Sequence, residues 1–339
     1  MNFSSQFSKT ITNIEEIGSV SQPRDMKVKE LALTTLPIDP YMPIANFENR
    51  KFNWKYFAGE LAWYLRKDND VDYIGQFSGF WSTLTNPNTN EINSNYGSLL
   101  FNEQLEWVVD SLKADQNTRQ AIAFLNQPKF QFEGNKDFVC TMYLNFFIRN
   151  NQLNMKVQMR SNDVFYGLTF DAPFFAFVQQ HVYLWLKDTY PELNLGVYYH
   201  CSDNSHFYER HFELASKIQQ ETIEDSTQYA MILDEPFFTI EAGKMLLTEH
   251  GLNFIEKVNE TIETEKPTQK EFKQIQPRKT RKGDRLFRVQ DIELLKQIHF
   301  LLREKKYSID GAKTYLKNNK EKAEKNIAVL NSLKNLNLH

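Results

Sequence analysis

Residues 137–161 place the tightest limit on how this chain can fold. Two runs rich in β-branched and aromatic residues flank the tripeptide Asn150-Asn151-Gln152, a pattern that predicts a β-hairpin. A strongly apolar stretch follows at 172–190 and predicts a long helix buried in the core. The centre of the chain is therefore expected to join an antiparallel hairpin to a core helix.

Helical and strand patterns mix irregularly around this centre. Apolar residues recur at helical spacing in 52–67 and 101–113, which predicts two amphipathic helices. Residues 195–212 predict a strand that ends in a polar turn and then enters a helix. Because no regular βαβ alternation is present, the sequence favours the α+β class.

The 339 residues suffice for one large domain, or for one domain with an appendage. No apolar run approaches the ~20 residues that span a bilayer, and the first residues lack the basic start and apolar stretch of a secretory signal. Only two cysteines, Cys140 and Cys201, are present, which argues against a disulfide framework. We therefore expect a cytoplasmic protein that makes no membrane contact.

Charge divides the chain into two parts. Residues 266–339 contain 19 Lys and Arg against 8 Asp and Glu, a net +11, whereas the other residues contain 21 and 35, a net −14. The polar segment 259–279 contains two prolines and is interpreted as a linker. We expect a catalytic domain at 1–258 and a small basic helical segment at 280–339, with different partners.

Cys140 is the first candidate for chemistry. It lies where a polar segment meets a predicted strand, and on residue type alone a buried cysteine that acts as a small hydrophobe is the more frequent case. As a nucleophile, its thiolate would need cationic groups nearby to lower its pKa. Arg160 lies on the second arm of the same hairpin and is expected to approach Cys140.

Other polar residues have two interpretations each. Arg160 and Ser161 at a strand end suit anion binding, or are a surface arginine with a turn-forming serine. Glu60 interrupts the apolar face of its helix, so it either reaches solvent or is a desolvated acid-base group. His206 and His211 lack cysteine or acidic partners at zinc spacing, so we expect no metal site.

Seven motifs between residues 46 and 212 occur in an order that resembles the thymidylate synthase superfamily. They are "GELAWYLRKDNDVDYI", "GFWSTL", "NEINSNYGSLL", "DQNTRQAI", "KDFVCTM", "MRSNDVFYG" and "SDNSHFY". The resemblance implies a mixed sheet packed with helices, a homodimer, and 5,10-methylenetetrahydrofolate as co-substrate, with no metal.

The resemblance also implies a role for each matching residue. The catalytic residues it implies are the nucleophile Cys140, with Glu60, Tyr96 and Asp171. The substrate-binding residues it implies are Arg24, Arg160, Ser161, Asp171, His206 and Tyr208, with Arg119 donated across the dimer interface. The co-substrate residues it implies are Glu60, Trp81, Asp163 and Gly167.

Departures from the thymidylate synthase pattern point to one branch of the superfamily. This chain has Thr141 where thymidylate synthases place histidine, Gln120 where they place a second phosphate-binding arginine, and Asp171 where they place asparagine. Their C-terminal closing segment has no recognisable counterpart. These features resemble bacteriophage deoxycytidylate hydroxymethylases more closely, which implies the host cytoplasm if the chain is viral.

Asp171 bears on which base is bound. Cytosine presents an N4 amino donor and an unprotonated N3, and a carboxylate accepts from the amino group. Uracil presents an O4 acceptor, which a carboxylate would oppose and an asparagine amide would satisfy. The alternative role for Asp171 is a helix N-cap, with Pro173 in the first turn.

The function implied is folate-dependent hydroxymethylation of dCMP for modified DNA precursors. The alternatives are thymidylate synthesis from dUMP, methylation of dCMP, and a DNA-binding protein on an inactive synthase scaffold. Thr141 and the missing closing segment favour hydroxymethylation.

The basic segment resembles another family. Residues 278–319 resemble the wing and following helices of MerR-type DNA-binding domains, with "GDRLFRVQDIELL" at the start of the wing and linker in place of the helix-turn-helix. A helix is predicted after Ser308. The segment either holds nucleic acid through phosphates or packs as a helical appendage on a protein.

Overall fold

The computed structural model describes residues 3–86, 89–223, 230–241, 243–265, 278–279, 285–286, 298, 301 and 309–318. The chain divides into two compact units, Met1–Val258 and Asn259–His339. The first unit contains every residue that the sequence proposes for catalysis.

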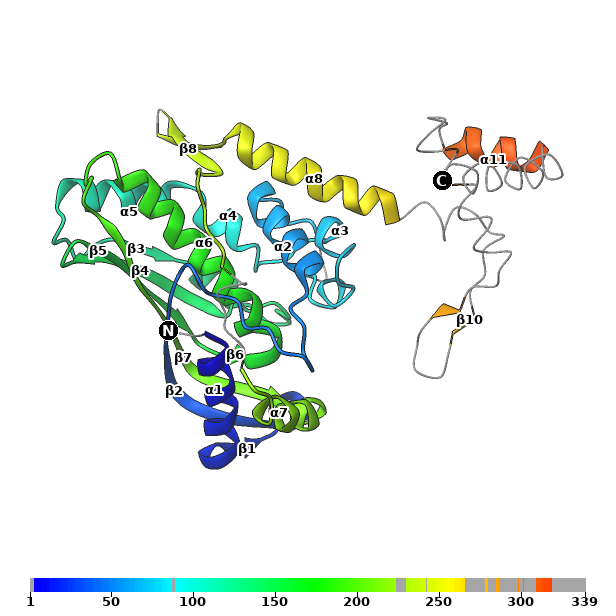
Figure 1. Cartoon of the computed structure of the whole chain (residues 1–339), viewed down its shortest axis with the longest axis horizontal. Helices are drawn as coiled ribbons and strands as arrows, with labels where there is room; N and C mark the ends of the chain where they lie inside the picture. The colour runs from blue at the N-terminus through cyan, green and yellow to red at the C-terminus, as the bar shows by residue number, and fades with distance from the viewer. Residues whose placement is uncertain are drawn as a thin grey trace, which may run out of the picture. The chain divides into compact units, whose positions relative to one another are not determined.

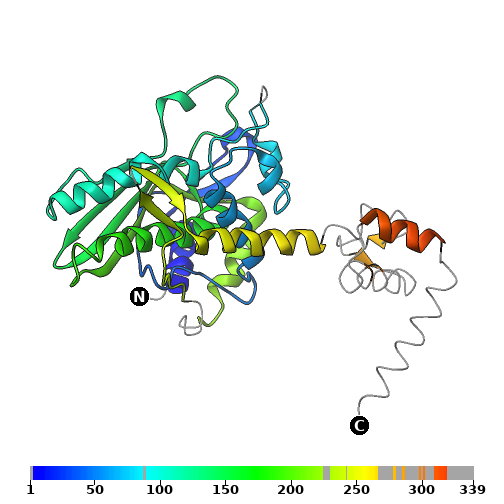
Figure 2. The same ribbon diagram turned by 90° about the horizontal axis from the view of Figure 1, so that it is seen from above.

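A mixed sheet forms the framework of the first unit. Its strands in spatial order are β1 (Ser19–Ser21), β2 (Val28–Ile38), β7 (Asn194–Tyr208), β5 (Gln152–Met159), β4 (Thr141–Arg149) and β3 (Ile122–Phe124), with β6 (Asn162–Asp163) paired to β7. Pairing is antiparallel except for β5 and β6, which run parallel to β7. Figure 2 shows the green strands β4, β5 and β7 side by side.

The predicted hairpin is confirmed as β4 and β5. Arg149 pairs with Gln152, so Asn150 and Asn151 alone form the turn. Both have positive φ, +52° and +56°, the left-handed conformation that two-residue hairpin turns require and that asparagine tolerates. The turn sets the register of the hairpin, and a register shift between Thr141 and Tyr143 then places Cys140 beside Arg160.

Helices cover the sheet, and Figure 1 shows α1 and α6 on the same side of it. The helices of three or more turns described for this unit are α1 (Phe3–Ile17), α2 (Trp54–Arg66), α5 (Glu103–Ala114), α6 (Thr169–Leu186) and α8 (Glu249–Glu265). Shorter ones are α3 (Val71–Ile74), α4 (Tyr96–Leu100), α7 (Phe212–Gln219), η1 (Pro23–Asp25), η2 (Trp81–Thr83), η3 (Pro128–Phe130), η4 (Val164–Leu168) and η5 (Glu209–His211). The α+β class is confirmed, as are the predicted helices at 52–67, 101–113 and 172–190.

Helix α6 forms the centre of the core. Its polar residues Gln179, Gln180 and His181 are buried, and each makes a hydrogen bond to backbone, although Gln179 Oε1 has no partner among the described residues. Gln179 donates to the Leu153 carbonyl (2.9 Å), and His181 accepts from the backbone N–H of Phe237 (2.8 Å). These bonds offset most of the cost of burying polar groups and hold α6 against the sheet.

The interpretation of Asp171 as the N-cap of this helix is wrong. A single π-helical turn, η4, continues directly into α6 at Thr169, so Asp171 lies within the first turn of the helix. The capping group is Asp163, whose Oδ1 accepts from the backbone N–H groups of Phe165 (2.8 Å) and Tyr166 (3.0 Å). Asp171 is thereby left to make side-chain contacts.

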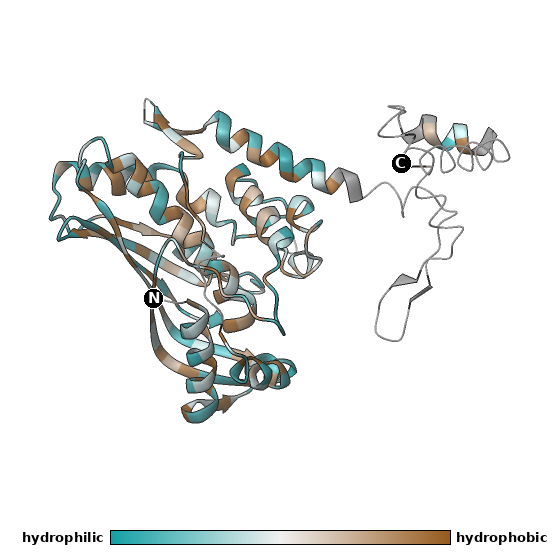
Figure 3. Cartoon of the chain, viewed as in Figure 1, coloured by the Kyte–Doolittle hydropathy of each residue, from teal (hydrophilic) through white to brown (hydrophobic). Residues whose placement is uncertain are grey.

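The end of the first unit carries a two-stranded sheet and an amphipathic helix. Strands β8 (Phe238–Glu241) and β9 (Lys244–Leu247) pair antiparallel, and α8 shows alternating hydrophobic and hydrophilic bands in Figure 3. The predicted linker at 259–279 starts inside α8, and residues 266–277 of it lie outside the described part. No helix in the described ranges is long and apolar enough to cross a membrane.

The second unit is described only in short pieces. Strands β10 (Arg278–Lys279) and β11 (Arg285–Leu286) pair antiparallel, and α11 spans Ile309–Asn318. Helix α11 confirms the helix predicted after Ser308. Ile292, Leu295 and Leu302, whose spacing in the sequence puts them on one face of an earlier helix, lie outside the described residues.

Candidate active site

Cys140 ends the loop that precedes β4 and lies against Arg160. The backbone N–H of Arg160 donates to the Cys140 carbonyl over 2.9 Å, and the Arg160 Nη2 lies 3.4 Å from the thiol Sγ. The guanidinium also donates to the carbonyls of Phe138 (2.5 Å) and Val139 (3.1 Å). The predicted approach of Arg160 to Cys140 is confirmed, and the loop that carries the cysteine fixes the arginine.

Burial controls the protonation of this cysteine. It raises the pKa of the Cys140 thiol to about 11, against the opposing charges of Arg160 and Arg24, while Asp171 and Asp137 raise it further. In the isolated chain Cys140 is therefore a thiol at neutral pH. A nucleophilic role requires a further cation or a base that takes the proton.

Two loops far apart in the sequence are joined beside Cys140. Asp137, three residues before the cysteine, accepts at Oδ2 from the backbone N–H of Ser94 (2.7 Å) and at Oδ1 from the Ser94 hydroxyl. Asn93 Nδ2 donates to the Asp137 carbonyl (2.9 Å). The "NSN" motif thus fixes the cysteine loop to the segment that begins α4.

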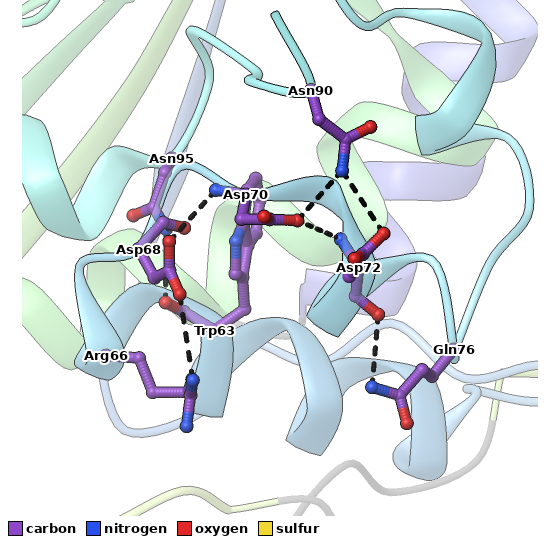
Figure 4. Close-up of polar contacts among 8 residues, drawn as sticks. All are labelled: Trp63, Arg66, Asp68, Asp70, Asp72, Gln76, Asn90 and Asn95. Carbon is purple, nitrogen blue, oxygen red and sulfur yellow. Dashed lines mark hydrogen bonds and ion pairs between the residues drawn. The ribbon is translucent and has the colours of Figure 1, made fainter.

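Asn95 fixes Tyr96 relative to α2. Its Oδ1 caps α4 by accepting from the backbone N–H of Ser98 (2.9 Å). Its Nδ2 donates to the carbonyls of Trp63 (3.1 Å) and Asp68 (2.8 Å), as Figure 4 shows. Tyr96, the first residue of α4, is therefore positioned by an asparagine that is itself fully buried.

Glu60 is buried rather than solvent-reaching, with 6% of its surface exposed. Its Oε1 accepts from the Tyr56 hydroxyl over 2.8 Å, and that hydroxyl accepts from the Trp81 indole N–H over 2.9 Å. Burial raises the pKa of Glu60 to about 8, although hydrogen bonds from Tyr56 and Tyr64 lower it; the charge of Asp171 raises it. A carboxyl with this pKa holds and releases a proton near neutral pH.

Asp171 lies in the same site, where its charge acts on both Cys140 and Glu60. Its Oδ2 accepts from Asn162 Nδ2 over 2.7 Å. Burial raises the pKa of Asp171 to about 6; the hydrogen bond from Asn162 lowers it and the charge of Asp163 raises it. At neutral pH the carboxylate form prevails, and a small drop in pH protonates it.

Gly167 makes room for this pair. A Cβ at Gly167 would lie 2.7 Å from Asn162 Nδ2 and 3.1 Å from Asp171 Oδ2. Any side chain there would press on the two atoms that form the hydrogen bond. The glycine is thus explained by the close approach of η4 to Asn162 and Asp171.

The remaining matched residues surround the same region. Asp163 Oδ2 is buried and, among the described residues, has no hydrogen-bond partner. His206 and Tyr208 lie two residues apart on β7, with ring centroids 5.5 Å apart. Burial lowers the pKa of His206 and raises the pKa of Tyr208, and in both the negative charge of Asp163 acts in the raising direction, which places all three in one neighbourhood.

Of the two other arginines that the sequence matches, Arg24 is the one whose charge acts on Cys140. Arg24, in η1, has a left-handed backbone (φ +50°) and contributes positive charge at Cys140. Arg119 is exposed ahead of β3, followed by Gln120, also exposed. Ser161 is half-buried directly after Arg160.

Within the described ranges, no cluster of three or more His, Cys, Asp or Glu residues could hold a metal ion.

Sequence reasoning missed several residues of this site. Tyr56 was missed although it precedes Glu60 by one helical turn, a spacing that puts both on one face. Asn162 stands inside the quoted "RSNDV" motif and received no role. Its contact with Asp171 depends on η4, which no local pattern in the sequence indicates.

A family model described as thymidylate synthase matches residues 5–250. The chain belongs to the thymidylate synthase family. A second model, described as MerR HTH family regulatory protein, matches residues 269–319 and begins inside the predicted linker. Both resemblances drawn from the sequence are thus confirmed.

Known relatives of this thymidylate synthase family member include phage enzymes. It is 29% identical over 221 residues to the deoxycytidylate 5-hydroxymethyltransferase of Enterobacteria phage T4, which covers 61% of this chain and 89% of the relative. It is 28% identical over 216 residues to the deoxyuridylate hydroxymethyltransferase of Bacillus phage SP01, which covers 58% of this chain and 55% of the relative. The chain thus spans about half the length of the SP01 protein.

Among solved structures, thermostable thymidylate synthase A from Bacillus subtilis is similar with a TM-score of 0.53 at 20% identity. The alignment covers 66% of this chain and 86% of that one. This similarity supports the fold of the first unit.

Proposed function

We propose that this chain is a deoxycytidylate 5-hydroxymethyltransferase, which transfers a one-carbon unit from 5,10-methylenetetrahydrofolate to C5 of dCMP. The observation that carries the choice of base is Asp171, a carboxylate close to Cys140 with Oδ2 already bound by Asn162. Within the described contacts Oδ1 accepts no hydrogen bond, so it can accept from the cytosine N4 amino group. Family membership and the two phage relatives support one-carbon transfer to a pyrimidine nucleotide.

Basic and polar side chains would hold the nucleotide. Arg160 and Ser161 suit the 5′-phosphate, since a guanidinium and a hydroxyl both donate to phosphate oxygens. Arg24 adds positive charge from η1, and Arg119 of a second subunit would add more. The added positive charge would also lower the pKa of the Cys140 thiol, because positive charge favours the thiolate.

His206 and Tyr208 would fix the deoxyribose. Their positions on one face of β7 direct both polar groups toward the same side of the strand. Asn204 Oδ1 accepts from the Nδ1–H of His206 over 3.0 Å and so orients the imidazole.

Catalysis would begin when the Cys140 thiolate bonds to pyrimidine C6. The electron pair of the C5–C6 double bond then moves toward C4 and N3, and C5 becomes nucleophilic. Asp171 stabilises this charge by sharing a proton with N3 while it accepts from N4. A pKa of about 6 suits this exchange, because the carboxylate prevails at neutral pH and yet takes up a proton at little cost.

The co-substrate would be bound against Asp163, Trp81 and Gly167. The unpaired Oδ2 of Asp163 is a buried acceptor-only atom, which fits the N–H donors of a pterin ring. 5,10-Methylenetetrahydrofolate supplies the one-carbon unit. Glu60, with a proton available near pH 8, manages proton transfer on the same side of the site.

The choice between hydroxymethyl and methyl products depends on water at the one-carbon unit. Glu60 can deprotonate a water molecule only when it is itself ionised. The Tyr56 hydroxyl donates to the Glu60 carboxylate and accepts from the Trp81 indole N–H. The alternatives remain thymidylate synthesis from dUMP and methylation of dCMP. Thr141 in place of histidine favours the hydroxymethyl product.

The direct test is to incubate the protein with dCMP and 5,10-methylenetetrahydrofolate and to identify the product by mass. We expect a nucleotide that is heavier than dCMP by one CH₂O group. A methylated product would contradict hydroxymethylation, and conversion of dUMP alone would contradict the choice of cytosine.

Replacing Glu60 with glutamine is expected to lower kcat roughly 10²–10⁴-fold, because an amide cannot exchange the proton.

The same change should stabilise the fold at high pH. A carboxyl whose pKa rises from 4.5 to about 8 on folding binds protons as the chain folds, so its cost to stability grows as the pH rises between these values. We expect the Tm of Glu60→Gln to exceed that of the wild type more at pH 8 than at pH 5. A constant Tm difference would contradict the buried, protonated state.

The basic segment is proposed to contact nucleic acid. Its match to the MerR family and the pair β10–β11, in which Lys279 lies opposite Arg285, support this role. The proposed layout has the catalytic domain at 1–258 and the basic segment at 280–339. Gel shifts of the whole chain on duplex DNA test the role, and no shift at low salt would contradict it.

A further inference from the structure

A chain of buried hydrogen bonds leads from Asp171 into the core. Asn162 Nδ2 donates to Asp171 Oδ2 (2.7 Å), and Asn162 Oδ1 lies 3.2 Å from His200 Nε2. His200 Nδ1 lies 2.6 Å from the Tyr198 hydroxyl. Asn162, His200 and Tyr198 are 3%, 2% and 0% exposed, so no solvent competes for these bonds. The proposed reaction gives none of the three a role.

The sheet holds this chain rigidly. Tyr198 and His200 lie two residues apart on β7 and so face the same side. Asn162 lies on β6, which runs parallel to β7 with Asn162 opposite Ser205. The backbones of all three residues are thus fixed by strand pairing, and the side chains have little freedom to rearrange.

The donors and acceptors are ordered in one direction. An ionised Asp171 only accepts, so the Asn162 amide must present Nδ2 to it and Oδ1 to His200. His200 must then carry its proton on Nε2, which leaves Nδ1 as the acceptor for the Tyr198 hydroxyl. Burial lowers the pKa of His200 to about 3 and raises that of Tyr198 well above its ordinary value, so both stay neutral.

A proton on Asp171 Oδ2 would be incompatible with this order. It would meet the donor Nδ2, unless the Asn162 amide turned over and His200 changed tautomer with it. A proton on Oδ1 meets no such obstacle. The hydrogen-bond chain therefore distinguishes the two oxygens of one carboxyl group.

We propose that Asn162, oriented by His200 and Tyr198, is a positioning residue that keeps Asp171 Oδ2 an acceptor and confines the exchangeable proton to Oδ1. This inference rests on the proposed function, in which Oδ1 is the oxygen that meets pyrimidine N3 and N4. Asn162 thereby ensures that the proton of Asp171 is where the base can share it. The residue sets both the orientation and the proton state of the group that selects the base.

Other groups also act on Asp171, and none of them replaces this contact. Asp163 on β6 raises its pKa, whereas Asn162 lowers it. The remaining groups that interact electrostatically with Asp171 are Tyr56, Glu60 and Tyr64 on α2, Tyr96 on α4, Cys140 before β4, and Tyr198 on β7. All of these groups are acids, so their ionisation would raise the pKa of Asp171. The hydrogen bond from Asn162 acts in the opposite direction and lowers it.

The titration of Asp171 tests the proposal in the nucleotide-free protein. The whole chain is labelled with ¹³Cγ-aspartate, and the Asp171 resonance is identified by its absence in Asp171→Asn. We expect a wild-type midpoint near 6 that rises by about one pH unit in Asn162→Ala. Tyr198→Phe should raise the midpoint by less, because Asn162 and His200 stand between Tyr198 and Asp171 in the hydrogen-bond chain. In ¹⁵N spectra, wild-type His200 should carry its proton on Nε2.

Tyr190→Phe is the matched control, because its hydroxyl donates to the Leu112 carbonyl (2.6 Å), away from this chain. It should titrate as the wild type does. An unchanged midpoint in both Asn162→Ala and Tyr198→Phe, or a proton on His200 Nδ1, overturns the proposal. If Asn162→Ala fails to fold, Tyr198→Phe decides.

Turnover separates this inference from the proposed function. In Asn162→Ala, kcat/KM for dCMP at pH 7 should fall about 10-fold, with its acid limb moved to higher pH. If dCMP is not a substrate but the midpoints still shift, the proposed function fails and the positioning role of Asn162 stands. If dCMP is a substrate and the midpoints stay unchanged, the proposed function stands and the positioning role of Asn162 fails.

Discussion

Cys140→Ala is expected to lower kcat for dCMP by on the order of 10⁴-fold or more, because no other group can form the bond to C6. Nucleotide binding should be largely kept, since Arg160 is fixed by the carbonyls of Phe138 and Val139 as well as by the thiol. The expected result is therefore a large loss of kcat with a small change in the Kd for dCMP. Steady-state kinetics and calorimetry measure the two quantities.

Cys201→Ala provides the matched control. Cys201 lies on β7, is half-buried, and accepts from the Thr35 hydroxyl over 3.5 Å. It should retain wild-type turnover. With a 5-fluorinated nucleotide and the co-substrate, the wild type and Cys201→Ala should gain the mass of a covalent adduct, whereas Cys140→Ala should not. Turnover by Cys140→Ala would refute the covalent mechanism.

The hairpin could be predicted from the sequence because its information is local. Asn150 and Asn151 tolerate the left-handed turn, and the strands on either side carry β-forming residues. Pairing of the two arms then brings Cys140 and Arg160 together, since they stand at its open end. The approach was predictable because the turn brings the two ends of the hairpin together, although the final pairing also depends on a register shift between Thr141 and Tyr143 that the sequence does not indicate.

Contacts set by tertiary packing could not be read in this way. Asn162 reaches His200 through the parallel pairing of β6 with β7, whose register depends on the whole sheet. The start of α6 was misassigned because the π-helical turn η4 precedes it without a break in helical pattern. Burial of Glu60 was left open because helical spacing shows which face carries a residue, and not what covers that face.

Asp171→Asn is expected to reverse the preference between dCMP and dUMP. The amide can donate to uracil O4, which a carboxylate would repel, and it loses the charge that accepts from cytosine N4. With ~1–3 kcal/mol for each mismatched contact, kcat/KM should fall about 10- to 100-fold for dCMP and rise by a similar factor for dUMP. Both substrates are measured on one enzyme preparation, so the ratio cancels differences in active fraction.

The orientation of the new amide follows from the contact with Asn162. Since Asn162 Nδ2 donates toward position 171 over 2.7 Å, it should hold the carbonyl oxygen of Asn at this position and turn the amide nitrogen toward the base. The gain for dUMP should therefore be smaller when Asp171→Asn is combined with Asn162→Ala. Asp203→Asn, an exposed carboxylate bound by Gln158 (2.8 Å), is the control and should keep the wild-type preference.

The pH dependence gives an independent check on the same substitution. Wild-type kcat/KM for dCMP should fall as the pH drops below about 6, because protonation of Asp171 in the free enzyme removes the charge that attracts the N4 amino group when dCMP binds. Asp171→Asn has no proton to gain there, so its kcat/KM for dUMP should be level through the same range. A preserved acid limb near 6 in this variant would assign that limb to another group, and an unchanged preference for dCMP would show that Asp171 does not read the base.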